Sequence, residues 1–570
     1  MKDFTKAAVL LIFQFLPMMC LPLPVPAQTD TQMRSILVLT GASSEEELDE
    51  EEIGRYLQFV ARPLALNLDP EAKLLASGLL SRYQVASLED YRSRSGDVLS
   101  FSELAAVDGF GEEAVSALRP FISLASRSAP GSLPGDGDKV SQDLLARGGW
   151  KGGKGYSGGV KYKVSFKEAV EGSLSATPSS WSGNLMFKGR RTPWRLLFGD
   201  YNLRFGQGLS LWSGLTLSGF SSSSSFSKRP SGLSPSFSWT GNGTHRGVAG
   251  DCHIGRFSFT AFLSAPGLKD RGKGAILLPG ANACWYGRSG QVSLTAFGDG
   301  RSGKVSADFR WNRKGCDYFG ETALDLGSGR MAAVAGTVLP LGGDWKLSGL
   351  LRSSPAASRE AGAALGLERY GLQATADLAV KESDRSRRQL KLFLKVPVQV
   401  SPDLVLSVRM TERIRPYEEY LKYRTGARAD LDWSTAGISA RYGESEGDAW
   451  KGRVRAEALL CRSLAFLSYL EAGRKTGQSS MYLRGTLFVV DNWDDRIYSY
   501  ERDAPGSFNV PAYYGRGVAL SAVAGRKYVF GKGKKKALRL YLRASSVTYP
   551  FMEEPKPAKT EARLQASLSL

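Results

Sequence analysis

Histidine is almost absent from this chain of 570 residues, which has only two, His245 and His253. No group of His, Cys and Asp residues has the spacing of a metal site. Serine is so abundant, as in the run from Ser221 to Ser225, that a serine near a histidine is no evidence for a catalytic pair. No glycine-rich phosphate loop opens a helix. We therefore predict no catalytic residues, no metal, no cofactor and no enzymatic activity.

Cysteine is scarce as well, with five residues in the chain. Four of them are widely separated and belong to no CxxC pair: Cys252, Cys284, Cys316 and Cys461. This spacing excludes a disulfide scaffold and a structural zinc site. Two alternatives remain: a single disulfide between Cys252 and Cys284, or isolated thiols that are buried or face lipid.

Long apolar runs are missing from the mature chain. After Ala27 no stretch reaches 18 apolar residues, which excludes a helical membrane protein. Before it, a short basic start and the apolar stretch Ala7 to Leu16 have the form of a signal peptide, which we predict at 1–27. Cys20 lies inside this peptide and lacks the preceding small residue of a lipoprotein signal.

What the chain has in abundance is alternation. From Gly155 to Leu570 about ten residues alternate apolar with polar, a Gly-, Ser-, Asp- or Lys-rich turn follows, and the pattern repeats. Side chains of a strand alternate between two faces, so this pattern predicts sheets with one oily and one wet face. Only 42% of residues are hydrophobic, which suits a barrel because only every second strand residue meets lipid. We predict a mainly β fold, a large antiparallel transmembrane β-barrel of about 24–26 strands over residues 155–570.

The residues before the barrel do not show this alternation. Residues 28–124 are predicted to form a small all-α domain. Residues 125–154 are predicted to be a linker, because Gly and Pro are too frequent in 129–138 and 148–155 to continue a helix.

Within the helical domain, Phe101 to Val115 predicts a helix, a tight Gly109-Phe110-Gly111 turn and a second helix. This resembles the helix-hairpin-helix motif of DNA-binding proteins. The preceding unit, Leu66 to Gly96, resembles a degenerate first copy that has lost its Gly-x-Gly. Together the two units resemble the tandem module of competence DNA receptors.

A second segment, Gly199 to Trp212 with the sequence GDYNLRFGQGLSLW, completes the resemblance. The mature chain is similar to large Gram-negative outer-membrane proteins that join periplasmic helix-hairpin-helix repeats to a C-terminal barrel. The resemblance implies an outer-membrane location, a periplasmic N-terminal domain and no enzymatic activity.

Charge argues against DNA as the partner of the hairpin. Glu112 and Glu113 follow Gly111 at the point where a phosphate would approach. Residues 44–125 hold sixteen acidic and seven basic residues, so the module is about nine charges negative and repels phosphates. We therefore predict that Gly109 to Glu113 contact the barrel or a periplasmic protein, with DNA uptake as the disfavoured alternative. The run Glu45 to Glu52 is interpreted as a charged helix start or a solvated face.

The barrel has the opposite sign, near +27. Many bases lie on the polar phase of its strands, and those predicted to face the lumen are Lys422, Arg424, Arg428, Arg453, Arg455, Arg539 and Arg543. Two interpretations stay open. The bases form a cationic lumen that attracts anions, or they pair with acids of neighbouring strands and stiffen a closed barrel.

The last ten residues predict an assembly signal for the barrel-assembly machinery, with Leu564, Ala566, Leu568 and Leu570 on the apolar face. Outer-membrane lipid and lipopolysaccharide are the other expected partners. Two function classes follow: a pore or transporter gated or plugged by the helical module, and a membrane-anchored scaffold that docks a periplasmic protein.

Overall fold

A computed structural model gives the fold of the chain. It describes residues 31–126 and 140–570, apart from 43, 49, 167–168, 190–192, 215–219, 221, 240–242, 266–276, 288, 301, 355–358, 383–386, 402–403, 418–419, 435–448, 477, 532–535 and 555. The predicted signal peptide, 1–27, and residues 127–139 of the predicted linker lie outside the described residues.

The helices gather at the N-terminal end. They are α2 (Thr31–Thr40), η2 (Glu45–Glu47), α3 (Glu50–Ala61), α4 (Glu71–Ala76), α5 (Arg82–Ser95), α6 (Phe101–Ala106) and α7 (Gly111–Leu118), with α8 (Ser223–Phe226) and η5 (Trp493–Asp495) in later loops. Among the described helices, none is both long and apolar enough to cross a membrane.

The strands occupy most of the remaining chain. Those before the middle are β1 (Leu64–Ala65), β2 (Ile122–Ser123), β3 (Val140–Lys151), β4 (Gly155–Phe166), β5 (Val170–Ala176), β6 (Trp181–Lys188), β7 (Trp194–Arg204), β8 (Gly232–Pro235), β9 (His245–Ile254), β10 (Phe257–Ser264), β11 (Leu278–Tyr286), β12 (Gly290–Gly298), β13 (Gly303–Arg313), β14 (Cys316–Asp325) and β15 (Arg330–Leu341). The others are β16 (Trp345–Ser354), β17 (Arg359–Arg369), β18 (Leu372–Glu382), β19 (Arg387–Ser401), β20 (Leu404–Tyr417), β21 (Tyr420–Ser434), β22 (Ala449–Leu460), β23 (Leu464–Lys475), β24 (Ser479–Val490), β25 (Ile497–Tyr498), β26 (Ala512–Tyr513), β27 (Gly515–Phe530), β28 (Lys536–Thr548) and β29 (Lys559–Ser569).

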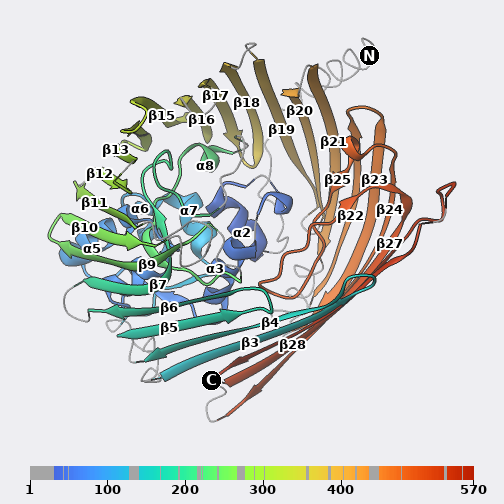
Figure 1. The fold of residues 1–570 in the computed structure, drawn as a ribbon, viewed down its shortest axis with the longest axis horizontal. Helices are drawn as coiled ribbons and strands as arrows, with labels where there is room; N and C mark the ends of the chain where they lie inside the picture. Colours follow the sequence, from blue (N-terminus) through green and yellow to red (C-terminus); the bar gives the residue numbers. More distant parts are fainter. Residues whose placement is uncertain are drawn as a thin grey trace.

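The strands close into one antiparallel barrel, which confirms the predicted fold class. Its sheet holds 25 strands of the described chain, and β8 is hydrogen-bonded to β7 beside the ring, so 24 strands form the wall. The ring closes where β29 pairs with β3 (Figure 1). An even number of antiparallel strands is typical of bacterial outer-membrane barrels.

The wall is apolar outside and polar inside. In β24, Leu483 is 54% exposed, whereas the next residue, Arg484, is only 5% exposed. In β10 the same alternation leaves Phe259 exposed and buries Ser258 and Thr260. A water-soluble protein would bury the leucine and the phenylalanine and expose the arginine. This inverted pattern fits a barrel whose outer surface meets lipid.

The predicted linker 125–154 is wrong over its second half, because β3 (Val140–Lys151) is a full wall strand paired with β4 and β29. The barrel therefore begins at 140 and not at 155. Its glycines serve packing. On the paired strand β4, a Cβ at Gly159 would lie 2.6 Å from Cζ3 of Trp239, a residue of the long connection between β7 and β9. Gly159 belongs to β4, outside the predicted linker, and makes room for that ring.

The connections differ between the two rims. Since the wall has an even number of strands, β3 begins and β29 ends at the same rim, with Asp143 opposite Ser569. Apart from 435–448, the connections at this rim have two to five residues. The two longest connections start at the opposite rim. We call 205–244 the first inner loop and 491–514 the second inner loop.

The helices α2–α7 form a unit inside the barrel, which we call the helical module (residues 31–126). Figure 1 shows these blue helices within the ring of strands. The module has its own apolar core, with Leu64, Leu74, Leu104 and Phe121 among its fully buried members. The α4–α5 and α6–α7 pairs each have a positive-φ glycine between their helices, Gly78 and Gly109.

Candidate functional site

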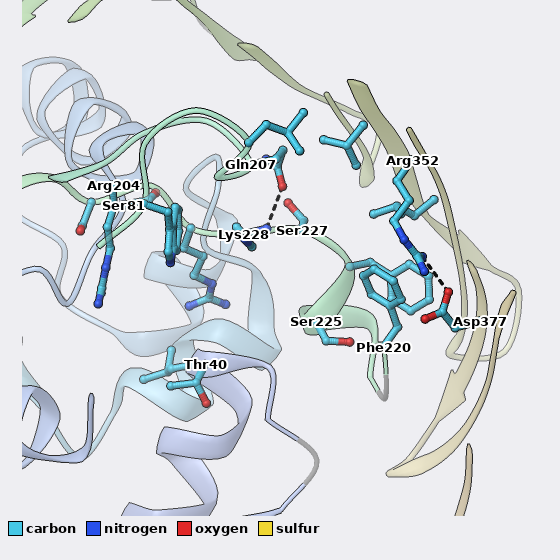
Figure 2. A pocket seen from close by; sticks show the side chains of 18 of the residues that line it. Thr40, Ser81, Arg204, Gln207, Phe220, Ser225, Ser227, Lys228, Arg352 and Asp377 are labelled. Atoms are coloured by element: carbon cyan, nitrogen blue, oxygen red, sulfur yellow. Dashed lines mark hydrogen bonds and ion pairs between the residues drawn. The ribbon is translucent and has the colours of Figure 1, made fainter. Parts of the chain in front are cut away.

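A cavity of about 490 Å³ lies where the helical module, the first inner loop and the wall meet. Figure 2 shows Thr40 and Ser81 of the module on one side and Arg352 with Asp377 of the wall on the other. Its size falls in the range of small-molecule binding sites.

The segment Gly199 to Trp212 shapes this region by turning the chain from the wall into the lumen. β7 pairs with β9 as far as Tyr201 and then with β8. The fully buried Asp200 carboxylate binds the Arg246 guanidinium, with a shortest contact of 2.7 Å. The Glu321 carboxylate accepts hydrogen bonds from the backbone N–H groups of Gln207 (2.7 Å) and Leu209 (3.0 Å).

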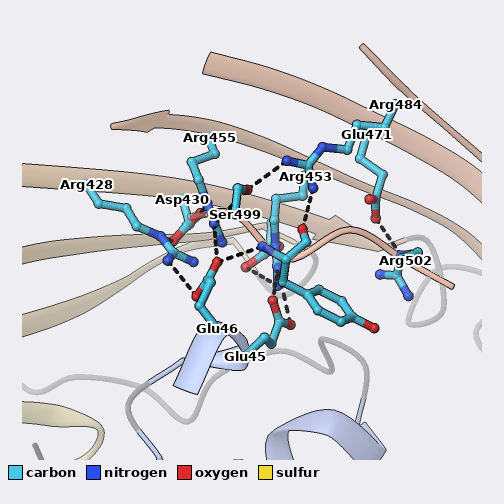
Figure 3. Close-up of polar contacts among 12 residues, drawn as sticks. Glu45, Glu46, Arg428, Asp430, Arg453, Arg455, Glu471, Arg484, Ser499 and Arg502 are labelled. Atoms are coloured by element: carbon cyan, nitrogen blue, oxygen red, sulfur yellow. Dashed lines mark hydrogen bonds and ion pairs between the residues drawn. The ribbon is translucent and has the colours of Figure 1, made fainter. Parts of the chain in front are cut away.

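A second part of the site is a cluster of ion pairs between the module and the opposite wall, drawn in Figure 3. Glu46 contacts Arg455 at 2.7 Å and Arg428 at 3.1 Å, and Glu45 contacts Arg453 at 3.1 Å. Arg455 is fully buried. We call these contacts the Glu45–Glu46 cluster. Glu45 and Glu46 begin the short helix η2, as one interpretation of the run Glu45 to Glu52 expected. The alternative of a solvated face is wrong for these two residues, which contact wall arginines.

The pKa values of the two carboxyl groups in the Glu45–Glu46 cluster are shifted in opposite directions. Burial raises the pKa of Glu46, but Arg428 and Arg409 outweigh it, and the result is a pKa of about 2. A depressed carboxyl pKa contributes stability above the ordinary value of 4.5, and that stability is lost as pH falls toward 2. For Glu45, burial outweighs Arg453 and the pKa is raised. Glu46 is therefore ionised at neutral pH.

The other predicted lumenal bases are also placed. Lys422 pairs with Asp494 at 2.7 Å, and Arg424 donates to the backbone oxygen of Arg496 at 2.9 Å. Arg543, which is 2% exposed, pairs with Glu501. Arg539 donates to Ser569 at 3.3 Å.

Like charges lie directly opposite each other on the inner wall. Lys395 is paired in register with Arg409, and Arg409 with Arg428. Directly opposed like charges destabilise a sheet. The nearby acids Asp430 and Glu46 offset this at Arg428. The wall at β19–β21 therefore depends on the module for part of its charge balance.

Of the predicted hairpin residues, Gly111 and Glu112 are exposed and Phe110 is buried. Gly109 packs on α5, where its carbonyl oxygen accepts a hydrogen bond from Gln84 at 2.9 Å. Glu113 forms an ion pair with Lys346 of β16, whereas Glu112 is exposed. Phe110 is buried in the module core, and no heavy atom lies within 4 Å of a Cβ placed at Gly111.

The second inner loop was not anticipated from the sequence. Its backbone N–H at Tyr500 donates to Glu46 at 3.2 Å, and its Asp503 and Glu501 pair with Arg563 and Arg543 of the wall. The signal that could have found it is the absence of alternation between Val490 and Gly515, a gap too long for a turn.

Both histidines lie where the module or a loop meets the wall. His253 lies between Glu71 (3.4 Å) and Ser258 (3.2 Å), an order that resembles acid, base and nucleophile. Ser258, however, is fully buried and its hydroxyl accepts from Arg82, so no substrate carbon reaches it. His245 stacks on Tyr201. The four cysteines at 252, 284, 316 and 461 are free thiols, so the open Cys252–Cys284 bridge is not formed.

Glu71 gives the module a pH dependence. Burial and, after it, the charge of Glu89 raise the pKa of Glu71 to about 7. The charge of Asp251 acts in the same direction and that of Arg195 opposes it. The side chain of Glu71 contacts His253. A raised carboxyl pKa means that the folded state loses stability as pH rises from about 4.5 to 7.

We predict that Glu71→Gln makes the protein less sensitive to this rise. In detergent, the wild-type midpoint of thermal unfolding should fall by a few degrees between pH 5 and pH 8, and the variant's should fall less. Glu112→Gln is the exposed control and should behave like the wild type. An equal fall in wild type and Glu71→Gln would contradict the prediction.

No known family model matches the chain, and a comparison with curated proteins finds no match either. Among solved structures it is similar to the P pilus usher PapC translocation pore, with 9% identity over 76% of this chain and 99% of that one and a TM-score of 0.35. It is also similar to the unliganded ferric citrate transporter FecA (8%, 76% and 79%, 0.36) and to OccK5 (OpdH) of Pseudomonas aeruginosa (9%, 76% and 97%, 0.25).

Proposed function

We propose that the protein is a gated outer-membrane channel whose lumen is closed by the helical module. The observation that carries this proposal is the Glu45–Glu46 cluster, in which acids of a separately packed helical unit pair with buried arginines of the wall. A unit held by side-chain contacts can leave the lumen without unfolding the barrel. Its negative charge and the positive wall favour docking at neutral pH.

The orientation follows from the rims. Outer-membrane barrels have short periplasmic turns and longer extracellular loops. The rim at which β3 begins, with its short turns, is therefore assigned to the periplasm, and the module enters from that side. Both inner loops then reach the module from the extracellular side. The first does so where Arg82 donates its backbone N–H to Pro230 at 3.2 Å.

The module itself is proposed to be a helix-hairpin-helix unit that has taken up a barrel-docking role. Gly109 and Gly111 keep the left-handed backbone of such a hairpin, with φ values of 84° and 69°. The ion pair of Glu113 with Lys346 supports docking to the barrel over binding to DNA. A scaffold role and DNA uptake remain the alternatives, and each requires the module surface to be exposed to the periplasm.

Planar bilayers test the channel. We predict little steady conductance for the full chain and a large, steady, anion-preferring conductance for a variant lacking residues 31–126. The deletion must end before Val140, because removing β3 would open the ring. A change in gel mobility on boiling verifies that the variant is folded. A folded deletion variant that conducts no current would support the scaffold instead.

A further inference from the structure

Four buried polar atoms around the cavity have no hydrogen-bond partner among the described residues. They are Nη2 of Arg55, Oγ of Ser227, Nη1 of Arg229 and Oγ of Ser231. Buried polar groups in folded proteins are almost always hydrogen-bonded, and a guanidinium left without partners is especially costly. Their gathering around one cavity indicates that a ligand supplies the missing acceptors.

The charges of the residues that line the cavity indicate which kind of ligand it binds. Seven basic residues line the cavity, namely Arg55, Arg204, Lys228, Arg229, Arg352, Lys391 and Arg413, against the two acids Glu360 and Asp377. Both acids pair with Arg352, at 3.4 and 2.6 Å. The lining therefore carries an excess of positive charge.

Arg229 is the clearest case. Burial lowers the pKa of its guanidinium, and the acids that act against this, Glu113 and Asp317, do not offset it. Those acids are already paired with Lys346 and Arg310. Arg229 also interacts with Tyr56, the neighbour of Arg55 in the chain and another residue of the lining.

Part of the lining is apolar. Leu79 comes from the module, Phe220 and Phe226 from the first inner loop, and Leu350 from the wall. Phe220 and Phe226 pack against each other with ring centroids 4.8 Å apart. An inorganic ion would leave this surface unused, whereas an organic anion can cover it and still present an oxyanion to the bases.

We propose that this cavity binds a small organic anion, its carboxylate or phosphate group held by Arg55 and Arg229 and its apolar part against Leu79 and Phe226. The proposal rests on the channel function above and names the class of its cargo. The module and the first inner loop build the site together. When the module leaves the lumen, Arg55 leaves with it and the anion is released.

Isothermal titration of the full chain in detergent tests the site, with phenyl phosphate, benzoate and the neutral benzyl alcohol as probes. We expect saturable binding of phenyl phosphate, benzoate or both, which separates the two oxyanions, and none of benzyl alcohol. Arg229→Gln and Arg55→Gln should each weaken binding roughly ten- to hundredfold, the range of one charged hydrogen bond. Arg94→Gln, at an exposed arginine paired with Asp90, should leave binding unchanged.

The result that overturns the proposal is absence of binding by both anions, equal binding of benzyl alcohol, or unchanged affinity in a folded Arg229→Gln or Arg55→Gln protein. Two variants are used so that misfolding of one leaves the other as a test, and mobility on unheated gels reports folding. Titration in detergent needs no open channel. Binding by the full chain, with no conductance of the variant lacking residues 31–126, would therefore refute the gate alone. Conductance of that variant, with no binding by the full chain, would refute the cavity alone.

Discussion

Replacing Glu45 and Glu46 together with lysine is expected to release the helical module and turn a closed barrel into a conducting one. The double change puts two positive charges against Arg428, Arg453 and Arg455, of which Arg455 is fully buried. Breaking a single buried ion pair costs about 3–5 kcal/mol, and the reversal adds repulsion. Such a loss is comparable to the whole stability of many small domains.

Two measurements check this expectation: single-channel current in planar bilayers and the rate of trypsin cleavage within residues 31–126. Both should rise by at least tenfold over the wild type. Glu112→Lys is the matched control, because Glu112 is an exposed acid of the same module outside the cluster. If the double variant stayed closed and protected while unheated gels showed an intact barrel, the cluster would not be what holds the module in place.

Deleting Glu561 to Leu570 is expected to abolish the folded barrel altogether. These residues include most of β29, which pairs along its length with β28 on one side and β3 on the other. Leu564 faces outward and is 56% exposed, while Gln565 is buried. The deletion removes both the predicted assembly signal and the strand that closes the ring, and it leaves two unpaired edges in a bilayer that cannot hydrogen-bond them.

Outer-membrane fractions and unheated gels provide the measurement, with no heat-modifiable band expected for the deletion. Leu570→Phe is the control. It keeps the strand and gives it the aromatic end usual in such signals, so assembly should be normal. Accumulation of folded barrel without residues 561–570 would show that another segment directs assembly and that the ring closes in a different way.

The barrel could be predicted because its cause is local. Alternation of Leu540 and Leu542 with Arg539 and Arg543 sets which side of a strand meets lipid, and that requires no knowledge of distant residues. The same period led to the bases that the structure places in the lumen, and the predicted range of 24–26 strands includes the 24 observed. The one wall strand missed was β3, because its Gly148 and Gly149 belong to the glycine-rich stretch that indicated a linker.

The interior could not be predicted in this way. Glu45 and Arg453 are 408 positions apart, and Arg82 reaches Asn282 across 200. Nothing near Arg55 or Arg229 in the sequence distinguishes them from the chain's many other bases. What sets them apart is that folding buries one guanidinium nitrogen of each at the same cavity without a hydrogen-bond acceptor among the described residues. This is a property of neighbours brought together only in three dimensions.

The sequence alone therefore determined the barrel and the opposite charges of module and wall, because each depends on composition or on a period of two residues. Only the tertiary structure decided that the module lies inside the ring, that two loops fold in to meet it, and which acids pair with which bases. Burial and pairing are long-range consequences of chain closure, since a carboxylate meets its arginine only after 24 strands have formed a wall around it.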